Sequence, residues 1–139
     1  MSYDFSNKIA LITGSSRGIG KTTALHFARM GADIVVNYFR KREAAEETAR
    51  EIEALGRKAL VVKADVGDPD DINRMFAEVE ASFGALDFLV NNAASGYIRP
   101  VMEQKVKGWD WTMNINARSA LFTTQKAVPL MRKRGGGAI

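Results

Sequence analysis

Short apolar runs alternate with longer amphipathic stretches along the chain. The runs occupy residues 9–12, 33–38, 58–63 and 86–90, and their aliphatic and β-branched residues favour buried strands. The intervening stretches repeat apolar residues at helical spacing, which is clearest at Ile72, Met75, Phe76, Val79 and Phe83. This alternation of strand and helix predicts an α/β fold with a doubly wound parallel sheet.

Helix boundaries can also be read from the sequence. Glycines 31, 56 and 84 follow the first three helical stretches, where a glycine commonly ends a helix. Asp68-Pro69-Asp70-Asp71 has an N-cap, a proline and first-turn acids, so we interpret these acids as structural.

The last third of the chain predicts one long helix from about Trp109 to Arg134. Its apolar stripe consists of Met113, Ala117, Ala120, Leu121, Thr124, Val128 and Met131. Asn116 interrupts this register, and Pro129 is expected to kink the helix near its end. Residues 135–139 resemble a turn and the first residues of a fifth strand. We therefore expect a single domain over residues 1–139, truncated at the start of strand 5.

Composition restricts the possible functions. With 46% apolar and 26% charged residues in 139, the chain is long and apolar enough to form a folded core. It has no cysteine, no long apolar run and no signal-like start, which favours a reducing cytoplasm and no membrane. The only histidine, His26, lies on the polar side of its helix, and no metal site is expected. The net charge of +4 is interleaved with acids, so nucleic acid is not the expected partner.

A glycine-rich loop joins the first strand to the first helix, in the residues TGSSRGIG from Thr13 to Gly20. Its glycines allow a backbone to approach a ligand closely, and the helix start offers free N–H groups to a phosphate. Arg17 and Lys21 stand where acids commonly occur, which leaves the site open for an outside anion such as a pyrophosphate. A plain glycine turn is the alternative.

Arg40-Lys41-Arg42 follows the second strand, where dinucleotide-binding folds meet the adenosine ribose. An acid at this place favours NAD, whereas an arginine favours the 2′-phosphate of NADP. The absence of an acid and the presence of Arg40 predict NADPH. For Arg42, the alternative is an ion pair with Glu46 on the outer face of the next helix.

Polar residues also follow the third and fourth strands. Asp65 could hold an adenine amino group or satisfy turn N–H groups. Residues 91–96, NNAASG, suit a flat polar ligand or a plain turn. Asn116 is either a tolerated surface residue or a placed functional group.

Four of these motifs, TGSSRGIG, Ala64-Asp65, NNAA and Asn116 after Trp109, together resemble the short-chain dehydrogenase/reductase family. The resemblance implies a Rossmann-type NAD(P) fold and a catalytic role for Asn116. It implies cofactor contacts at Gly14, Ser15, Ser16, Arg17, Gly18, Ile19, Gly20, Asp65, Val66, Asn92, Ala93 and Ala94. Ala94 departs from the family, which has a glycine there.

Residues 91–116 look like those of NADPH-dependent enoyl-acyl-carrier-protein reductases of the short-chain type. This resemblance implies hydride transfer to the β-carbon of an enoyl thioester in fatty acid synthesis, with a tyrosine and a lysine expected beyond Ile139. The residues given would then be inactive alone, and the full-length protein a homo-oligomer, commonly a tetramer. The alternatives are a 3-oxoacyl-thioester or other carbonyl reductase of the family, or a non-catalytic NADP-binding fragment.

Two assignments concern the substrate side. Tyr97 is expected to face the substrate or pack the loop, because no lysine stands at the family's spacing from it. Arg99, Lys105 and Lys107 are candidates for docking an acidic acyl carrier protein, with a solvated loop as the alternative.

Overall fold

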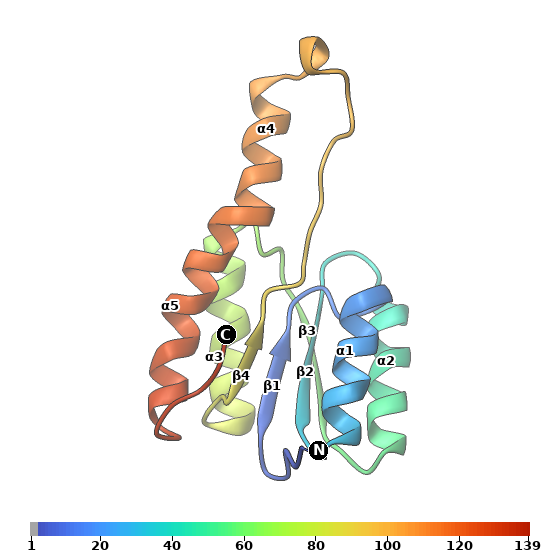
Figure 1. Ribbon diagram of the computed structural model, residues 1–139, viewed down its shortest axis with the longest axis vertical. Coiled ribbons are helices and arrows are strands. Elements are labelled where there is room, and N and C mark those ends of the chain that lie inside the picture. The colour runs from blue at the N-terminus through green and yellow to red at the C-terminus, as the bar shows by residue number, and fades with distance from the viewer. Residues whose placement is uncertain (1–2) are drawn as a thin grey trace.

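Four parallel strands form the central sheet of the structure, a computed structural model that describes residues 3–139 (Figure 1). The strands are β1 (Ile9–Ile12), β2 (Asp33–Tyr38), β3 (Ala59–Lys63) and β4 (Phe88–Val90). Their order is β3-β2-β1-β4, with Ala10 opposite Ile34 on one side and Phe88 on the other. The predicted fold class is therefore confirmed.

Helices cover both faces of the sheet (Figure 1). One face carries α1 (Gly18–Arg29) and α2 (Arg42–Ala54), and the other carries α3 (Pro69–Phe83) and α5 (Ser119–Arg132). Because successive strand residues point to opposite faces, Ile12 packs with the first pair of helices and Leu11 with the second. Both side chains are completely buried, as expected for a central parallel strand.

Most predicted boundaries are close to the observed ones. The Asp68 side chain accepts a hydrogen bond from the Asp70 N–H at 2.9 Å, which confirms the predicted N-cap of α3. Gly84 ends that helix with φ of 73°, in the left-handed region that glycine adopts easily. β4 begins at Phe88 rather than Leu86, because the Leu86 N–H instead bonds the Leu130 carbonyl on α5.

The prediction of one helix from Trp109 to Arg134 is wrong in its start and in its buried face. Helix α4 (Val106–Met113) begins three residues earlier, and a π-helical segment, η2 (Asn114–Arg118), separates it from α5. The buried positions are Ile115, Ser119, Thr123, Ala127, Leu130 and Met131. Leu121, assigned to the apolar stripe, is 56% exposed.

Two effects explain the shifted face. A π turn contains an extra residue, so it rotates the helix surface that follows it. In addition, the Ser119 and Thr123 hydroxyls donate to carbonyls four residues back, at 2.5 and 2.9 Å, which allows polar side chains to be buried. Helix α5 continues past Pro129 to Arg132.

Residues 94–113, which we call the arm, extend beyond the carboxyl ends of the strands (Figure 1). The arm rises from β4, passes through the short 3₁₀ helix η1 (Val101–Glu103) and returns along α4. At the other end of the chain, Ala138 forms a parallel bridge with Phe88 of β4, which agrees with the predicted start of a fifth strand. Within residues 3–139, no helix has the length and apolar character needed to cross a membrane.

Candidate functional site

A cleft of about 550 Å³ opens at the carboxyl ends of the strands. It lies between the neighbouring strands β1 and β4. From β1 the chain continues to β2 on one side, and from β4 it continues to the Ala138 bridge on the other side. Such a change of direction is the usual ligand site of open parallel sheets. Its lining residues are Gly14, Ser16, Arg17, Gly18, Asn37, Tyr38, Phe39, Arg40, Lys41, Ala64, Asp65, Val66, Asn92, Ala93, Ala94, Ser95, Trp111 and Ile115. Most of the predicted cofactor residues are among them, but Ser15, Ile19 and Gly20 are outside the lining, as is Asn116, the predicted catalytic residue.

Glycines shape the loop for two different reasons. A Cβ atom on Gly14 would lie 2.9 Å from the Ala93 Cα atom, and one on Gly20 would lie 2.6 Å from the Asn92 Nδ2 atom. Side chains at these positions would therefore push the loop away from the end of β4. A Cβ atom on Gly18 would meet nothing within 4 Å, so this glycine leaves an open backbone surface on the cleft.

The first turn of α1 points a positive helix end at the cleft. Its N-cap residue, Arg17, makes no side-chain capping hydrogen bond, and the first turn contains no acid. The first N–H groups of a helix have no partner within the helix, and the helix dipole adds positive potential there. With the glycine surface beside it, this helix start fits a diphosphate.

Lys21 has a different role from the one expected. Its ammonium group pairs with Glu51 at 2.7 Å and Glu47 at 3.2 Å, both on α2. The hydrogen bond with Glu51, followed by the one with Glu47, raises the pKa of Lys21. Lys21 thus joins α1 to α2, and Arg17 remains as the cation of the loop at the cleft.

Ser15 and Asn37 form a buried network beneath the loop. The Ser15 hydroxyl donates to the Ile12 carbonyl at 2.7 Å and accepts from the Asn37 N–H at 3.1 Å. The Asn37 amide accepts from the Gly14 N–H at 2.9 Å and donates to the Ala64 carbonyl at 3.2 Å. Ser15 therefore positions the loop from inside the fold, and a ligand contact by its side chain stays a prediction.

A second network connects the loop to the end of β4. The Thr13 hydroxyl accepts from the Asn92 and Ala93 N–H groups, both at 3.0 Å. The Asn92 side chain donates back to the Thr13 and Gly14 carbonyls at 2.9 and 3.2 Å. These bonds hold the backbone of Ala93 and Ala94 at the cleft, where the nicotinamide side is predicted.

The sequence analysis assigned no role to the Asn37 amide or to the Thr13 hydroxyl. The available signal for Asn37 was an amide inside the otherwise apolar strand DIVVNY, where a buried polar group needs partners.

Asp65 performs the turn role considered for it. One carboxylate oxygen accepts from the Gly67 N–H at 2.8 Å, closing a tight turn after β3. The residue also lines the cleft, so its contact with an adenine stays a prediction.

Arg40 and Arg42 have different surroundings: Arg42 pairs with an acid on α2, whereas Arg40 lies at the cleft. Arg42 donates to Glu46 at 2.6 Å, which confirms the predicted ion pair on α2 and raises the pKa of Arg42. Arg40 lies at the cleft, exposed, with its guanidinium 5.3 Å from the centre of the Phe39 ring. Among residues 3–139, no ion pair involves Arg40.

Asn116 lies on the π-helical segment and contacts the base of the arm. Its amide accepts from the Ser95 N–H at 3.0 Å and donates to the Ser95 carbonyl at 2.5 Å. This paired contact gives Asn116 a positioning role, and its predicted catalytic role stays a prediction.

Tyr97 lies outside the cleft, in a hollow of the arm. Its ring centre is 5.1 Å from that of Trp111, which lines both the hollow and the cleft. Elsewhere His26 is exposed, as expected, and residues 3–139 contain no group of three or more His, Asp or Glu side chains able to hold a metal ion.

Comparisons with known proteins identify the family. A family model described as short chain dehydrogenase matches residues 8–139. The 3-oxoacyl-[acyl-carrier-protein] reductase FabG of Staphylococcus aureus is 40% identical over 132 residues, which are 95% of this chain and 54% of that protein. The cyclohexanol dehydrogenase of an Acinetobacter species is 39% identical over 140 residues, 100% of this chain and 55% of that protein.

Solved structures agree. L-sorbose reductase from Gluconobacter frateurii, complexed with NADPH and L-sorbose, has a TM-score of 0.95 and 39% identity, covering 100% of this chain and 53% of that one. A short chain dehydrogenase from Burkholderia cenocepacia in complex with NADP has a TM-score of 0.86 and 37% identity, covering 88% and 50%. The chain spans about half the length of these proteins. It belongs to the short-chain dehydrogenase family.

Proposed function

We propose that the full-length protein is an NADPH-dependent oxidoreductase that reduces 3-oxoacyl thioesters carried on acyl carrier protein, in fatty acid synthesis. One observation carries the proposal: a cleft fitted to a dinucleotide occurs in a chain that is 40% identical to a 3-oxoacyl-[acyl-carrier-protein] reductase over 95% of its length. From the composition and the family resemblance, we expect a cytoplasmic homo-oligomer.

The cleft offers a place for each part of the cofactor. The loop and the start of α1 would hold the diphosphate, Asp65 and Val66 would lie at the adenine, and residues 92–94 at the nicotinamide. Arg40, free of an ion pair within residues 3–139, would bind the 2′-phosphate. NADP and NADPH in the solved neighbours agree with the cofactor expected from the sequence.

The cofactor supplies a hydride when bound. In 3-oxoacyl reduction, the ketone carbon gains that hydride and its oxygen gains a proton, which gives a 3-hydroxyacyl thioester and NADP⁺. In this chain, the Thr13–Asn92 bonds hold the glycine loop against the end of β4, where we expect the nicotinamide, and Asn116 holds Ser95 close by. Proton supply is expected from a tyrosine and a lysine beyond Ile139, as the family resemblance implies.

Enoyl-thioester reduction, the leading expectation from the sequence, becomes the second candidate. The relatives named above are a 3-oxoacyl reductase, a cyclohexanol dehydrogenase and a sorbose reductase, which are names of carbonyl or alcohol chemistry rather than enoyl reduction. The enoyl alternative is supported by the resemblance of residues 91–116 to enoyl-acyl-carrier-protein reductases. The first part of this segment lines the cleft, at residues 92–95.

A substrate comparison tests the proposal. The full-length protein is given NADPH and either the acetoacetyl or the crotonyl thioester of the same acyl carrier protein, so that the acyl groups match in carbon number. We expect NADPH oxidation with the acetoacetyl substrate to be at least about tenfold faster, with a 3-hydroxybutyryl product by mass spectrometry. Faster reduction of the crotonyl substrate would establish the enoyl alternative, and turnover of neither would overturn the assignment to thioesters.

A further inference from the structure

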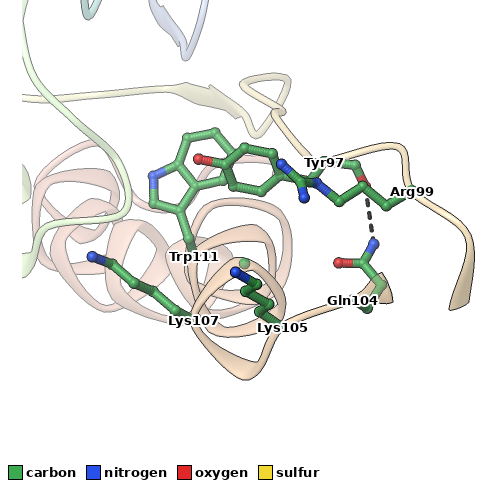
Figure 2. Close-up of a pocket in the computed structure, with 7 residues that line it drawn as sticks. Tyr97, Arg99, Gln104, Lys105, Lys107 and Trp111 are labelled. Atoms are coloured by element: carbon green, nitrogen blue, oxygen red, sulfur yellow. Dashed lines mark hydrogen bonds between the residues drawn. The ribbon is translucent and has the colours of Figure 1, made fainter. Parts of the chain in front are cut away.

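The arm contains a hollow of about 250 Å³ that combines aromatic and cationic side chains (Figure 2). Tyr97 and Trp111 supply the rings, and Arg99, Lys105 and Lys107 supply the charges. Figure 2 shows the Trp111 and Tyr97 rings beside each other and both lysines on the same side of them, with Lys105 pointing toward the rings. We call this site the aromatic–basic hollow.

Contacts within the arm hold the walls of this hollow in place. The Gln104 side-chain amide donates to the Tyr97 carbonyl at 3.2 Å, and the Tyr97 ring lies 5.1 Å from Trp111 (Figure 2). A Cβ atom on Gly108 would come within 3.3 Å of the Tyr97 ring, so the absence of a side chain lets α4 pack against it. The Arg99 guanidinium lies 5.9 Å from the centre of the same ring.

The charges of the hollow are not neutralised within the described chain. Among residues 3–139, no ion pair involves Arg99, Lys105 or Lys107, and the lining contains no carboxylate. Helix α4 starts beside them with no acid and no side-chain cap in its first turn. Three like charges and a helix start in one hollow favour an anion, and the two rings favour an apolar group attached to it.

Trp111 relates the hollow to the cofactor cleft, because this residue lines both. A ligand with its anion in the hollow could therefore extend past Trp111 toward Ala94 and Ser95. A phosphopantetheine arm has this form, with a phosphate at one end, an apolar dimethyl group next to it and the thioester at the far end. We propose that the aromatic–basic hollow binds the phosphate of the phosphopantetheine arm of the substrate.

This inference rests on the proposed function and specifies how the substrate is held. The same phosphate occurs in acyl carrier protein and in coenzyme A, so the hollow would accept either source. Neighbouring cations that contact only the protein surface of the carrier would behave differently, because coenzyme A lacks that surface.

The test compares two substrates that differ only in the phosphate, acetoacetyl-pantetheine and acetoacetyl-4′-phosphopantetheine. The full-length protein is compared with the double variant Lys105→Gln with Lys107→Gln. A matched control removes two charges at the other end of the molecule, with Arg29→Gln and Lys58→Gln, both exposed. Acetoacetyl-coenzyme A and the acetoacetyl carrier protein are the further arms.

We expect the phosphate to raise kcat/KM of the unaltered protein about tenfold, through KM, as for hydrogen bonds to a charged group. The hollow variant should lose this gain for the phosphopantetheine, coenzyme A and carrier-protein substrates, retain its rate with pantetheine, and differ from the control. Equal rates with and without the phosphate would overturn the inference, as would a loss confined to the carrier-protein substrate.

Failure of the proposed function is distinguishable, because the unaltered protein would then reduce none of the acetoacetyl substrates. Should the double variant fail to fold, as judged by circular dichroism, Arg99→Gln gives the same comparison on an exposed residue.

Discussion

Two amide side chains, Asn37 and Asn92, organise the cofactor cleft. Asn37 is 2% exposed and connects the glycine loop to the end of β3, while Asn92 connects the loop to the end of β4. The sequence analysis identified Asn92 but assigned no role to Asn37.

It also assigned no role to Asp87, which lies outside the cleft lining. That carboxylate is 3% exposed and accepts from the Ile9 N–H at 2.9 Å and from Lys8 at 3.1 Å. Such partners are distant in sequence, so periodicity does not predict them.

Replacing Asn37 with leucine, which has a similar size, should destabilise the protein and weaken NADPH binding. The Gly14 N–H and the Ala64 carbonyl would lose their partner, at a cost of roughly 1–3 kcal/mol for each buried group. Chemical denaturation of the full-length protein measures the loss. Asn73→Leu, at an exposed position on α3, is the control, and an equal stability of the two variants would contradict this role of Asn37.

Among the helices and strands, the sequence pattern predicted the features that depend on residues close together in the chain. The strand, glycine loop and helix of residues 9–29 were predicted because glycines and apolar spacing act over a few residues. The buried face of α5 was not, because it depends on the π turn at 114–118 and on hydroxyls that bond their own helix. The contact of Asn116 with Ser95 likewise needs the arm to return to the sheet.

Two alanine substitutions separate the roles of the loop glycines. Gly20→Ala would press a methyl group against Asn92 and the Gly14 carbonyl, so we expect a loss of stability near the upper end of the roughly 1–3 kcal/mol typical of overpacking. The methyl group of Gly18→Ala would have no atom within 4 Å. This variant should therefore lose only about 1 kcal/mol of stability, from the strain of alanine at φ of 57°.

Thermal unfolding of the full-length variants without cofactor measures both losses. A Gly20→Ala variant as stable as Gly18→Ala would show that the loop does not depend on its close approach to the end of β4.

At the scale of the whole molecule, topology assembles the cleft. Strand order β3-β2-β1-β4 brings four loop regions, distant in sequence, to one edge of the sheet. The parallel sheet and the general place of the cleft were expected from the sequence, whereas the order of the strands comes from the structure. The arm could not, because its extended course beyond the sheet follows from contacts such as Gln104 with Tyr97 that no periodic pattern marks.

We propose that this cleft holds NADPH and that Arg40, which lines it, binds the 2′-phosphate. Titration of the full-length protein with NADPH and NADH tests it most directly, in the unaltered protein, in Arg40→Gln and in Arg42→Gln. Arg42 is the matched control, because its guanidinium already pairs with Glu46.

We predict that the unaltered protein prefers NADPH and that Arg40→Gln binds NADPH about ten- to a hundredfold more weakly, as expected for a lost charge-assisted pair. NADH binding should be unchanged in Arg40→Gln, and Arg42→Gln should retain the preference for NADPH. Equal affinity of the unaltered protein for both cofactors, or an Arg40→Gln variant that keeps the preference, would contradict this role of Arg40.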